Sequence, residues 1–368
     1  MSKGASTHLE IAKLRLSLIQ MKVNISGISY YLPEKVEGLN DLQHDNPDWD
    51  MRKILEKTGI RTRHIAASDQ TASDLAYIAA EKLLSEIKPQ YQIDLLILVT
   101  QSPDYLLPTS ACILQNRLRL SQNCMAFDVN LGCSGFVTAL SIAGGLIETG
   151  VVNTGLILCA DTYSKYINKH DRACRPIFSD GAAAILVEKS ALDCIGPFAF
   201  GTDGSGFEHL IVRQGGARET INPSDQRNPT LAMNGSDVFL FTMRVVPACI
   251  HNLLDRTELS IDQIDLFIFH QASKLVIDNI IRLMSLDVDK VFVNHEFIGN
   301  TVSATIPIAL KDAVANGRLN PGQTVLLIGF RVGLSWSGVL LRWSACQQPR
   351  LINHIRRVAL AARRPMTL

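Results

Sequence analysis

QIDLLILVTQS at residues 92–102 and QIDLFIFHQAS at residues 263–273 are two versions of one segment, offset by 171 positions along the chain. Each is an uninterrupted apolar run, entered by the same Gln-Ile-Asp tripeptide, with the length and composition of a buried β-strand. Continuous runs of this kind mark strands that are covered on both faces of a sheet. The pair therefore predicts that the chain contains two copies of one α/β unit.

The same offset relates further elements of the chain. The helix-like pattern of residues 136–150 falls on residues 305–319 to within two positions, and the strand-like pattern of 154–163 falls on 325–334. A strand, a helix and a strand repeated in the same order indicate a duplicated α/β fold. Ligands of such folds bind where the strand ends of the two halves meet.

Changes in composition divide the chain into five parts. The residues between the two halves are rich in glycine, proline and polar side chains, which indicates a linker or lid. In chain order we expect an N-terminal extension at 1–20, a first half at 21–195, a linker or lid at 196–229, a second half at 230–345 and a basic tail at 346–368.

The composition is that of a globular protein with a sizeable core. Of the 368 residues, 47% are apolar and 19% are charged, and the net charge of +1 gives no global field for nucleic acid or a membrane surface. The eight cysteines show neither a CxxC pair nor zinc-site spacing, as is typical of free thiols in a reducing compartment. Residues 1–20 lack the apolar core of a signal peptide, and the other apolar stretches are too short to span a membrane. We therefore expect a cytoplasmic protein without a metal site.

The most informative single residue is Cys133, in the stretch DVNLGCSGF at 128–136. It follows a strand-like run and precedes a helix-like pattern. It is therefore expected at a helix N-terminus, where unpaired N–H groups and the helix dipole lower the pKa of a thiol. Such a position suits a nucleophile. Most cysteines are nevertheless small buried hydrophobic residues, and the position of Cys133 alone does not decide between the two interpretations.

Two residues of the second half fall at matching places. His270 ends the strand-like run DLFIFH, and Asn300 precedes the second-half helix, within a few residues of the place that Cys133 takes in the first half. Taken singly, the histidine would be structural and the asparagine a helix cap. Together, a thiol, an imidazole and a carboxamide at converging strand ends and helix starts favour a catalytic site.

These three side-chain types suit acyl transfer followed by carbon–carbon bond formation. A thiolate attacks an activated carbonyl, and its thioester product keeps the acyl group reactive toward a carbon nucleophile. Neutral His270 and Asn300 can both donate hydrogen bonds to one oxyanion, such as the enolate left when a malonyl thioester loses carbon dioxide. A carboxylate in place of Asn300 would repel that charge. The chemistry requires neither a metal nor a redox cofactor.

Over residues 21–344 the chain resembles the 3-oxoacyl-acyl-carrier-protein synthase III family of the thiolase superfamily. The resemblance is carried by DVNLGCSGF, HQAS and GNTVSATIPIAL, together with TGIRTRHIA, QSPDYLLPTSACILQ, FSDGAAAILVE and MNGSDVFLF. It implies a duplicated α-β-α-β-α layered sandwich, usually a homodimer, without a bound cofactor. Its substrates would be acyl-coenzyme A and malonyl-acyl carrier protein, and its product a 3-oxoacyl thioester for fatty-acid, secondary lipid or polyketide synthesis.

The resemblance also assigns roles residue by residue. Cys133 would be the acylated nucleophile, while His270 and Asn300 would assist malonyl decarboxylation and stabilise the enolate. Arg172 would touch the coenzyme A nucleotide, and Leu107 would enter the acyl pocket across the dimer. The remaining assignments are the pocket residues Phe330 and Arg331, the oxyanion-hole N–H groups of Cys133 and Val332, the substrate contact Lys57, and the carrier-docking residues Lys274 and Arg282.

Several positions depart from the family pattern. Arg331 and Val332 stand where glycines are usual, in a loop that borders the acyl pocket, so a different pocket is expected. If Arg331 points into the pocket, it either shortens the acyl chain that is accepted or pairs with a carboxylate on the acyl group. Lys53 stands at the position of a coenzyme-stacking tryptophan, and Lys57 replaces an arginine. These departures favour a member of a secondary pathway over the initiator of fatty-acid synthesis.

Three other interpretations of the same residues stay open. A papain-like cysteine peptidase also uses Cys, His and Asn in this order, but the C-G-[SA]-C-[WY] surround is missing and a duplicated α/β pattern does not suit that fold. An acyltransferase that moves the acyl group from Cys133 to a hydroxyl or amine, without decarboxylation, fits the altered docking residues, although Asn300 disfavours it. A non-catalytic partner subunit is disfavoured because none of the three residues is lost.

Overall fold

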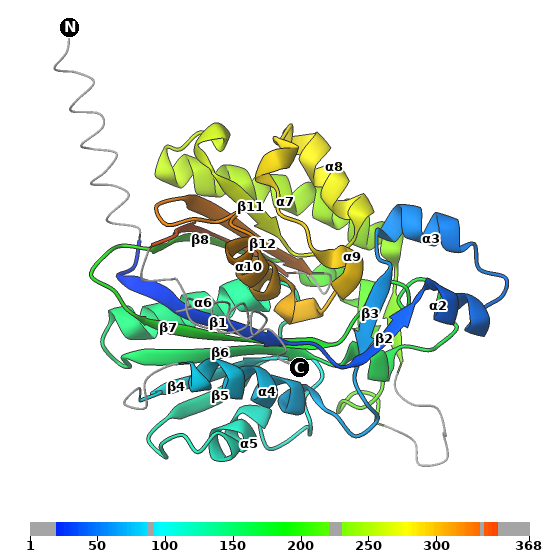
Figure 1. The fold of residues 1–368 in the computed structure, drawn as a ribbon, viewed down its shortest axis with the longest axis horizontal. Helices are drawn as coiled ribbons and strands as arrows, with labels where there is room; N and C mark the ends of the chain where they lie inside the picture. Colours follow the sequence, from blue (N-terminus) through cyan, green and yellow to red (C-terminus); the bar gives the residue numbers. More distant parts are fainter. Residues whose placement is uncertain (1–19, 87–91, 221–229, 332–334, 345–368) are drawn as a thin grey trace, which may run out of the picture.

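Two large β-sheets form the frame of the protein (Figure 1) in the computed structural model, which describes residues 20–86, 92–220, 230–331 and 335–344. The first sheet, in the order β1-β7-β6-β4-β5, consists of β1 (Val23–Tyr31), β4 (Leu95–Val99), β5 (Met125–Val129), β6 (Thr154–Asp161) and β7 (Gly181–Lys189). The second sheet, in the order β11-β12-β13-β8, consists of β8 (Ile195–Thr202), β11 (Leu266–Phe269), β12 (Thr324–Arg331) and β13 (Ser335–Arg342).

The two sheets repeat one strand pattern. In the first sheet, β4 runs parallel to β6, and β6, β7 and β1 are successive antiparallel neighbours. In the second, β11 runs parallel to β12, and β12, β13 and β8 are successive antiparallel neighbours. The strands β4 and β11 come from the two similar segments 92–102 and 263–273, so the predicted duplication is confirmed by the topology.

Helices cover both faces of each sheet. The outer helices are α4 (Ala72–Ser85) and α5 (Ser110–Arg117) on the first sheet, and α7 (Gly235–Thr257) and α8 (Lys274–Met284) on the second. Between the sheets lie α6 (Gly135–Glu148) and α10 (Thr305–Ala315) (Figure 1). The predicted α-β-α-β-α layered sandwich is confirmed.

The strand β4 shows why an uninterrupted apolar run suits this architecture. Leu95, Ile97 and Val99 point into the core between the two sheets. Leu96 and Leu98 point the other way, into the core beneath α4 and α5. Because successive side chains of a strand alternate between its faces, a strand with helices on both sides needs an apolar residue at every position.

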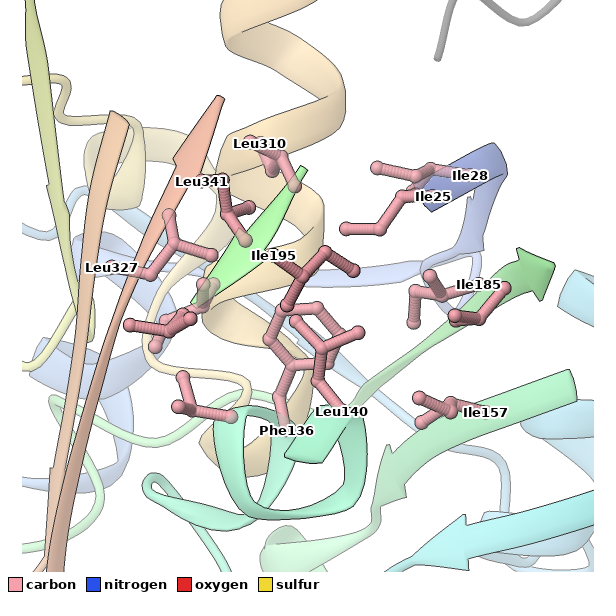
Figure 2. Close-up of a cluster of buried hydrophobic side chains, with 14 of the residues drawn as sticks. Ile25, Ile28, Phe136, Leu140, Ile157, Ile185, Ile195, Leu310, Leu327 and Leu341 are labelled. Carbon is pink, nitrogen blue, oxygen red and sulfur yellow. The ribbon is translucent and has the colours of Figure 1, made fainter. Parts of the chain in front are cut away.

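The core between the sheets is built around α6 and α10 (Figure 2). Its fully buried members include Phe136 and Leu140 of α6, Leu310 of α10, Ile157 of the first sheet and Leu327 of the second. Burial of apolar surface contributes about 25 cal/mol per Å² to the stability of the fold. This shared core therefore stabilises the packing of both sheets on the same two helices. The N-termini of α6 and α10 are thereby held in fixed positions relative to both sheets.

Shorter elements lie outside the layered core. Two strand pairs and three helices complete the structure: β2 (Lys35–Gly38) with β3 (Thr62–Ile65), β9 (Leu210–Val212) with β10 (Leu231–Met233), α2 (Leu39–Asp45), α3 (Met51–Thr58) and α9 (His295–Ile298). Short 3-10 helices of three to six residues connect other elements of the described chain.

The predicted linker begins too early. Residues 196–202 belong to β8, an edge strand of the second sheet that pairs with β13. Pro197 made this segment resemble a loop, but an edge strand tolerates proline because it leaves one row of its backbone groups unpaired. The second half of the fold therefore begins at β8. Residues 1–19, 221–229 and 345–368 lie outside the described part of the chain, so the expected extension and basic tail are not tested.

The helix α7 is longer and more apolar than the sequence analysis allowed. Alone among the described helices, it has the length and composition that a membrane span requires. One face of α7, which includes Val246, Ile250 and Leu253, is buried against β8, β12 and β13. We therefore interpret α7 as the covering helix of the second sheet.

Replacing Phe136 with alanine should open a cavity between the two sheets, because this side chain is fully buried in the inner layer. We expect the free energy of unfolding to fall by about 3–5 kcal/mol, measured by urea denaturation with tryptophan fluorescence. Phe207→Ala is the matched control, since Phe207 is 56% exposed, and it should change stability by less than about 0.5 kcal/mol. Similar losses in both variants would contradict the inner-layer packing.

Candidate active site

A cavity of about 860 Å³ contains residues of both halves of the fold. Cys133 from the first half lines it together with His270 and Asn300 from the second. The sequence analysis placed these three residues at converging strand ends and helix starts, and the structure brings them into one cavity. Their side chains are at most 7% exposed, so chemistry among them is shielded from bulk water.

The nucleophile candidate Cys133 directly precedes Ser134, the N-cap residue of α6. Strand β12 of the second sheet packs directly against its backbone at Gly329. A Cβ added to Gly329 would lie only 2.6 Å from the carbonyl oxygen of Cys133. Only glycine permits this approach. The hydroxyl of Ser337 on β13 donates to the Ser134 carbonyl at 2.8 Å, so both halves position the start of α6.

The predicted lowering of the Cys133 pKa is wrong for the protein without substrate. Burial raises the pKa of this thiol to about 12; the positive charge of Arg331 lowers it, and the negative charge of Asp161 raises it further. The free energy needed to remove the thiolate from water is larger than the stabilisation that the helix start and Arg331 give to the thiolate. Cys133 is therefore a protonated thiol at neutral pH, and it must lose its proton during attack.

His270 directly follows β11, and a hydroxyl determines its orientation. Its Nδ1 lies 2.7 Å from the Oγ1 of Thr305, and the same hydroxyl lies 3.1 Å from the carbonyl oxygen of Val302, to which it can donate. Burial lowers the pKa of His270 to about 3, with a smaller contribution from the charge of His295. The imidazole is therefore neutral, and one of its two nitrogens carries a proton.

Asn300 is held so that its amide group faces His270. Its Oδ1 accepts from the backbone N–H of Val302 at 3.0 Å, which leaves Nδ2 3.3 Å from His270 Nε2. The loop that follows is tied to the first half, because the hydroxyl and N–H of Ser303 donate to Asp161 at 2.5 and 3.1 Å. An amide has two N–H donors, so the second one is left for a ligand.

The sequence analysis missed Thr305 as a member of this network. The residue lies within the quoted stretch GNTVSATIPIAL, at the first position of α10. A threonine at a helix start reads as a capping residue, and no sequence signal shows that it faces a histidine 35 positions earlier. Tyr163, which also lines the cavity, was missed because no sequence signal shows that it faces the site.

The remaining predicted substrate residues that line the cavity differ in exposure. Lys53, Lys57 and Arg172 line it with exposed side chains, so the part of the lining that solvent reaches carries three cations, which we call the cationic entrance. Phe330 and Arg331 line it at the end of β12. Ammonium and guanidinium groups at an opening suit the phosphates of a nucleotide or a phosphorylated carrier.

Other predicted residues lie outside this cavity. Leu107 is 82% exposed and is not among the residues that line it. Lys274 and Arg282 lie on α8 with exposed side chains, where Lys274 pairs with Asp278. Val332 lies outside the described residues, so its contribution to an oxyanion hole is not tested. In the described part of the chain, no cluster of three His, Cys, Asp or Glu side chains could hold a metal ion.

Family models match both halves of the chain. A model of 3-oxoacyl-[acyl-carrier-protein] synthase III matches residues 127–204, which include Cys133. A model of the C-terminal part of the same enzyme matches residues 254–343, which include His270 and Asn300.

Individual proteins are similar over nearly the whole chain. The β-ketoacyl-[acyl-carrier-protein] synthase III of Syntrophomonas wolfei subsp. wolfei is 36% identical, over 89% of this chain and 99% of its own length. A crystal structure of a 3-oxoacyl-(acyl-carrier-protein) synthase III is 44% identical, with a TM-score of 0.84 over 88% of this chain and all of its own. The priming β-ketosynthase of the R1128 polyketide pathway is 29% identical, with a TM-score of 0.81 over 88% of this chain and 97% of its own.

Alkylation of Cys133 should depend steeply on pH, because iodoacetamide reacts with the thiolate and burial raises the pKa of this thiol to about 12. Between pH 7 and pH 9.5 we expect the rate to rise roughly tenfold per pH unit without a plateau. Intact mass after timed exposure measures it, and Cys133→Ser shows the background from other cysteines. A plateau below about pH 8 would mean that the helix start outweighs burial.

Proposed function

The chain belongs to the 3-oxoacyl-[acyl-carrier-protein] synthase III family, and we propose that it makes a 3-oxoacyl thioester in two steps around Cys133. As a member of this family it is an acyltransferase that condenses an acyl group with a malonyl thioester. The observation that carries the assignment of roles is the neutral pair of His270 and Asn300, hydrogen-bonded in the cavity that Cys133 lines.

The first step transfers the acyl group to Cys133. The sulfur attacks the carbonyl carbon of the acyl donor, so a bond to Sγ forms and the bond to the donor's sulfur breaks. The thiol proton passes to the departing sulfur, which leaves as a thiol. His270 Nε2 relays this proton when Nδ1 carries the hydrogen that Thr305 accepts. The backbone N–H of Cys133, at the start of α6, stabilises the oxyanion.

The second step forms the carbon–carbon bond. The malonyl thioester loses its carboxylate as carbon dioxide, and the electron pair of the broken bond becomes an enolate. His270 and Asn300 donate hydrogen bonds to the enolate oxygen. For this, Nδ1 of His270 releases its proton to solvent and Nε2 takes one up, and the Thr305 hydroxyl turns from Val302 to donate to Nδ1. The enolate carbon attacks the acyl carbonyl, the bond to Cys133 breaks, and the thiolate regains a proton from solvent.

Cationic side chains away from the three catalytic residues suit the binding of both substrates. The exposed cations Lys53, Lys57 and Arg172 at the entrance suit the phosphates of acyl-coenzyme A. Lys274 and Arg282 present two further cations on α8, where an acidic acyl carrier protein would dock. Neither step changes an oxidation state that requires a redox cofactor, and we propose that the enzyme works without a resident metal.

The proposed assembly is a homodimer. Tyr105, Leu106 and Leu107 are 62–83% exposed next to one another, which is unusual for apolar side chains on the surface of a monomer. In the dimer, Leu107 would enter the acyl pocket of the partner subunit. We place the enzyme in the cytoplasm, where both thioester substrates are made. Because Lys53 and Arg331 depart from the residues usual in the family, we place it in a secondary lipid or polyketide pathway.

The two steps can be separated with variants. Cys133→Ala should show no mass gain with any acyl-coenzyme A, because the nucleophile is missing. Asn300→Ala should still gain the acyl mass but form the 3-oxoacyl product at least about 100-fold more slowly, since it lacks one donor to the enolate. Asn320→Ala, at an exposed asparagine away from the cavity, is the matched control.

Intact mass measures loading, and product formation with malonyl-acyl carrier protein measures condensation. Condensation at the wild-type rate in Asn300→Ala would contradict the proposed role of this residue. Acyl transfer to a hydroxyl or amine, with no consumption of malonyl-acyl carrier protein, would favour the alternative without decarboxylation.

A further inference from the structure

Arg331 brings a guanidinium group to the wall of the cavity beside the nucleophile. It is the last residue of β12 and lines the cavity. A Cβ added to Gly132, the residue before Cys133, would lie 3.0 Å from the Cδ of Arg331. Cys133 and Tyr163 line the same cavity; burial raises the pKa of both groups, and the charge of Arg331 offsets part of that rise.

The hydrogen-bonding capacity of Arg331 is largely unused. Its Nη2 donates to the hydroxyl of Tyr163 over a long distance of 3.4 Å, and that hydroxyl in turn donates to Gln101 at 2.8 Å. Its Nε is shielded from solvent and has no hydrogen-bond partner among the residues that the structure describes. A guanidinium has five N–H donors in a planar fork, so most of them remain for a ligand.

No carboxylate in the described part of the chain forms an ion pair with Arg331. Burial raises the pKa of the Asp161 carboxyl to about 6 and the nearby charge of Arg331 offsets part of that rise, but Asp161 forms no ion pair with Arg331 because its oxygens are already engaged. It accepts hydrogen bonds from the backbone N–H of Gln101 and from the N–H and hydroxyl of Ser303. A partly buried cation that no carboxylate pairs with directly is costly, and a bound anion that accepts its hydrogen bonds lowers that cost.

Under the proposed function, two carboxylates could reach Arg331: the carboxylate of the malonyl group and a carboxylate on the acyl group. They differ in whether they react. The carboxylate of the malonyl group must leave as carbon dioxide, and an ion pair with Arg331 would stabilise it before the bond breaks and slow that step. A carboxylate at the far end of the acyl group, by contrast, survives both steps unchanged. Arg331 therefore suits a carboxylate that belongs to the acyl group.

We propose that Arg331 selects an acyl donor with a distal carboxylate, the thioester of a short dicarboxylic acid such as succinate or glutarate, whose carboxylate pairs with Nε and Nη2. The inference rests on the proposed function, because it concerns the group that is loaded on Cys133. In the loading step the sulfur of Cys133 bonds to the thioester carbonyl carbon, the thiol of coenzyme A leaves with the proton, and the distal carboxylate does not react.

The test compares donors that differ only at the far end of the acyl chain. Succinyl- and glutaryl-coenzyme A are paired with butyryl- and valeryl-coenzyme A, in which a methyl group replaces the carboxylate. The rate of mass gain at limiting donor concentration is measured for the wild type, for Arg331→Met and for Arg318→Met. Arg318 is an exposed arginine outside the cavity, so its variant controls for the loss of a positive charge.

We expect the wild type to load one of the carboxylated donors at least about tenfold faster than its neutral partner, since an ion pair with hydrogen bonds is worth at least this factor. Arg331→Met should reverse the preference, and Arg318→Met should keep it. A wild-type preference for the neutral donors, or an equal loss for both kinds of donor in Arg331→Met, would overturn the inference while leaving the proposed function intact.

Two further outcomes also decide the question. If Arg331→Met keeps the wild-type loading profile but slows condensation with malonyl-acyl carrier protein, the guanidinium contacts the acceptor and the inference is wrong. If the wild type gains no mass from any of the four donors while acetyl-coenzyme A loads Cys133, the pocket is only shortened by Arg331 and the inference is again wrong. A wild type that loads no donor at all would overturn the proposed function itself.

Discussion

The site depends on the burial of two helices between two sheets. Apolar side chains of α6 and α10, among them Phe136 and Leu310, are buried in the core between the two sheets. Neither helix can therefore shift without opening a cavity in this core. Their N-terminal ends bear Cys133 on one side and the Asn300–Thr305 loop on the other. The close approach of Gly329 to the Cys133 carbonyl and the hydrogen bonds of Ser303 to Asp161 then connect each end to the opposite half.

The same burial determines the protonation states of the reacting groups. Loss of hydration raises the pKa of the Cys133 thiol to about 12 and lowers that of the His270 imidazole to about 3. Both groups are neutral near pH 7, so the charges close to the reacting atoms are those of Arg331 and of the buried Asp161. A neutral histidine and a neutral amide are suited to bind an enolate, and the hydroxyl of Thr305 decides which imidazole nitrogen holds the proton.

Sequence patterns predict the repeat and the three central residues because both are local signals. A strand covered on two faces needs the unbroken apolar runs of β4 and β11, and the motifs around Cys133, His270 and Asn300 are short. The strand β8 escaped prediction because the tolerance of an edge strand for Pro197 depends on its neighbours. The pKa of Cys133 was predicted with the wrong sign, since burial comes from Gly329, Phe330 and other residues about 200 positions away. That Arg331 forms no ion pair within the described residues is likewise visible only in three dimensions.

The most direct test of the account follows the carboxyl carbon of the acceptor through one turnover. Enzyme acylated at Cys133 is mixed with malonyl-acyl carrier protein that carries ¹³C in its free carboxylate, and labelled carbon dioxide and 3-oxoacyl product are quantified together. The account predicts equal amounts of the two, both formed only when the cysteine is acylated. Product that retains the label, or carbon dioxide released without product, would contradict decarboxylative condensation at this site.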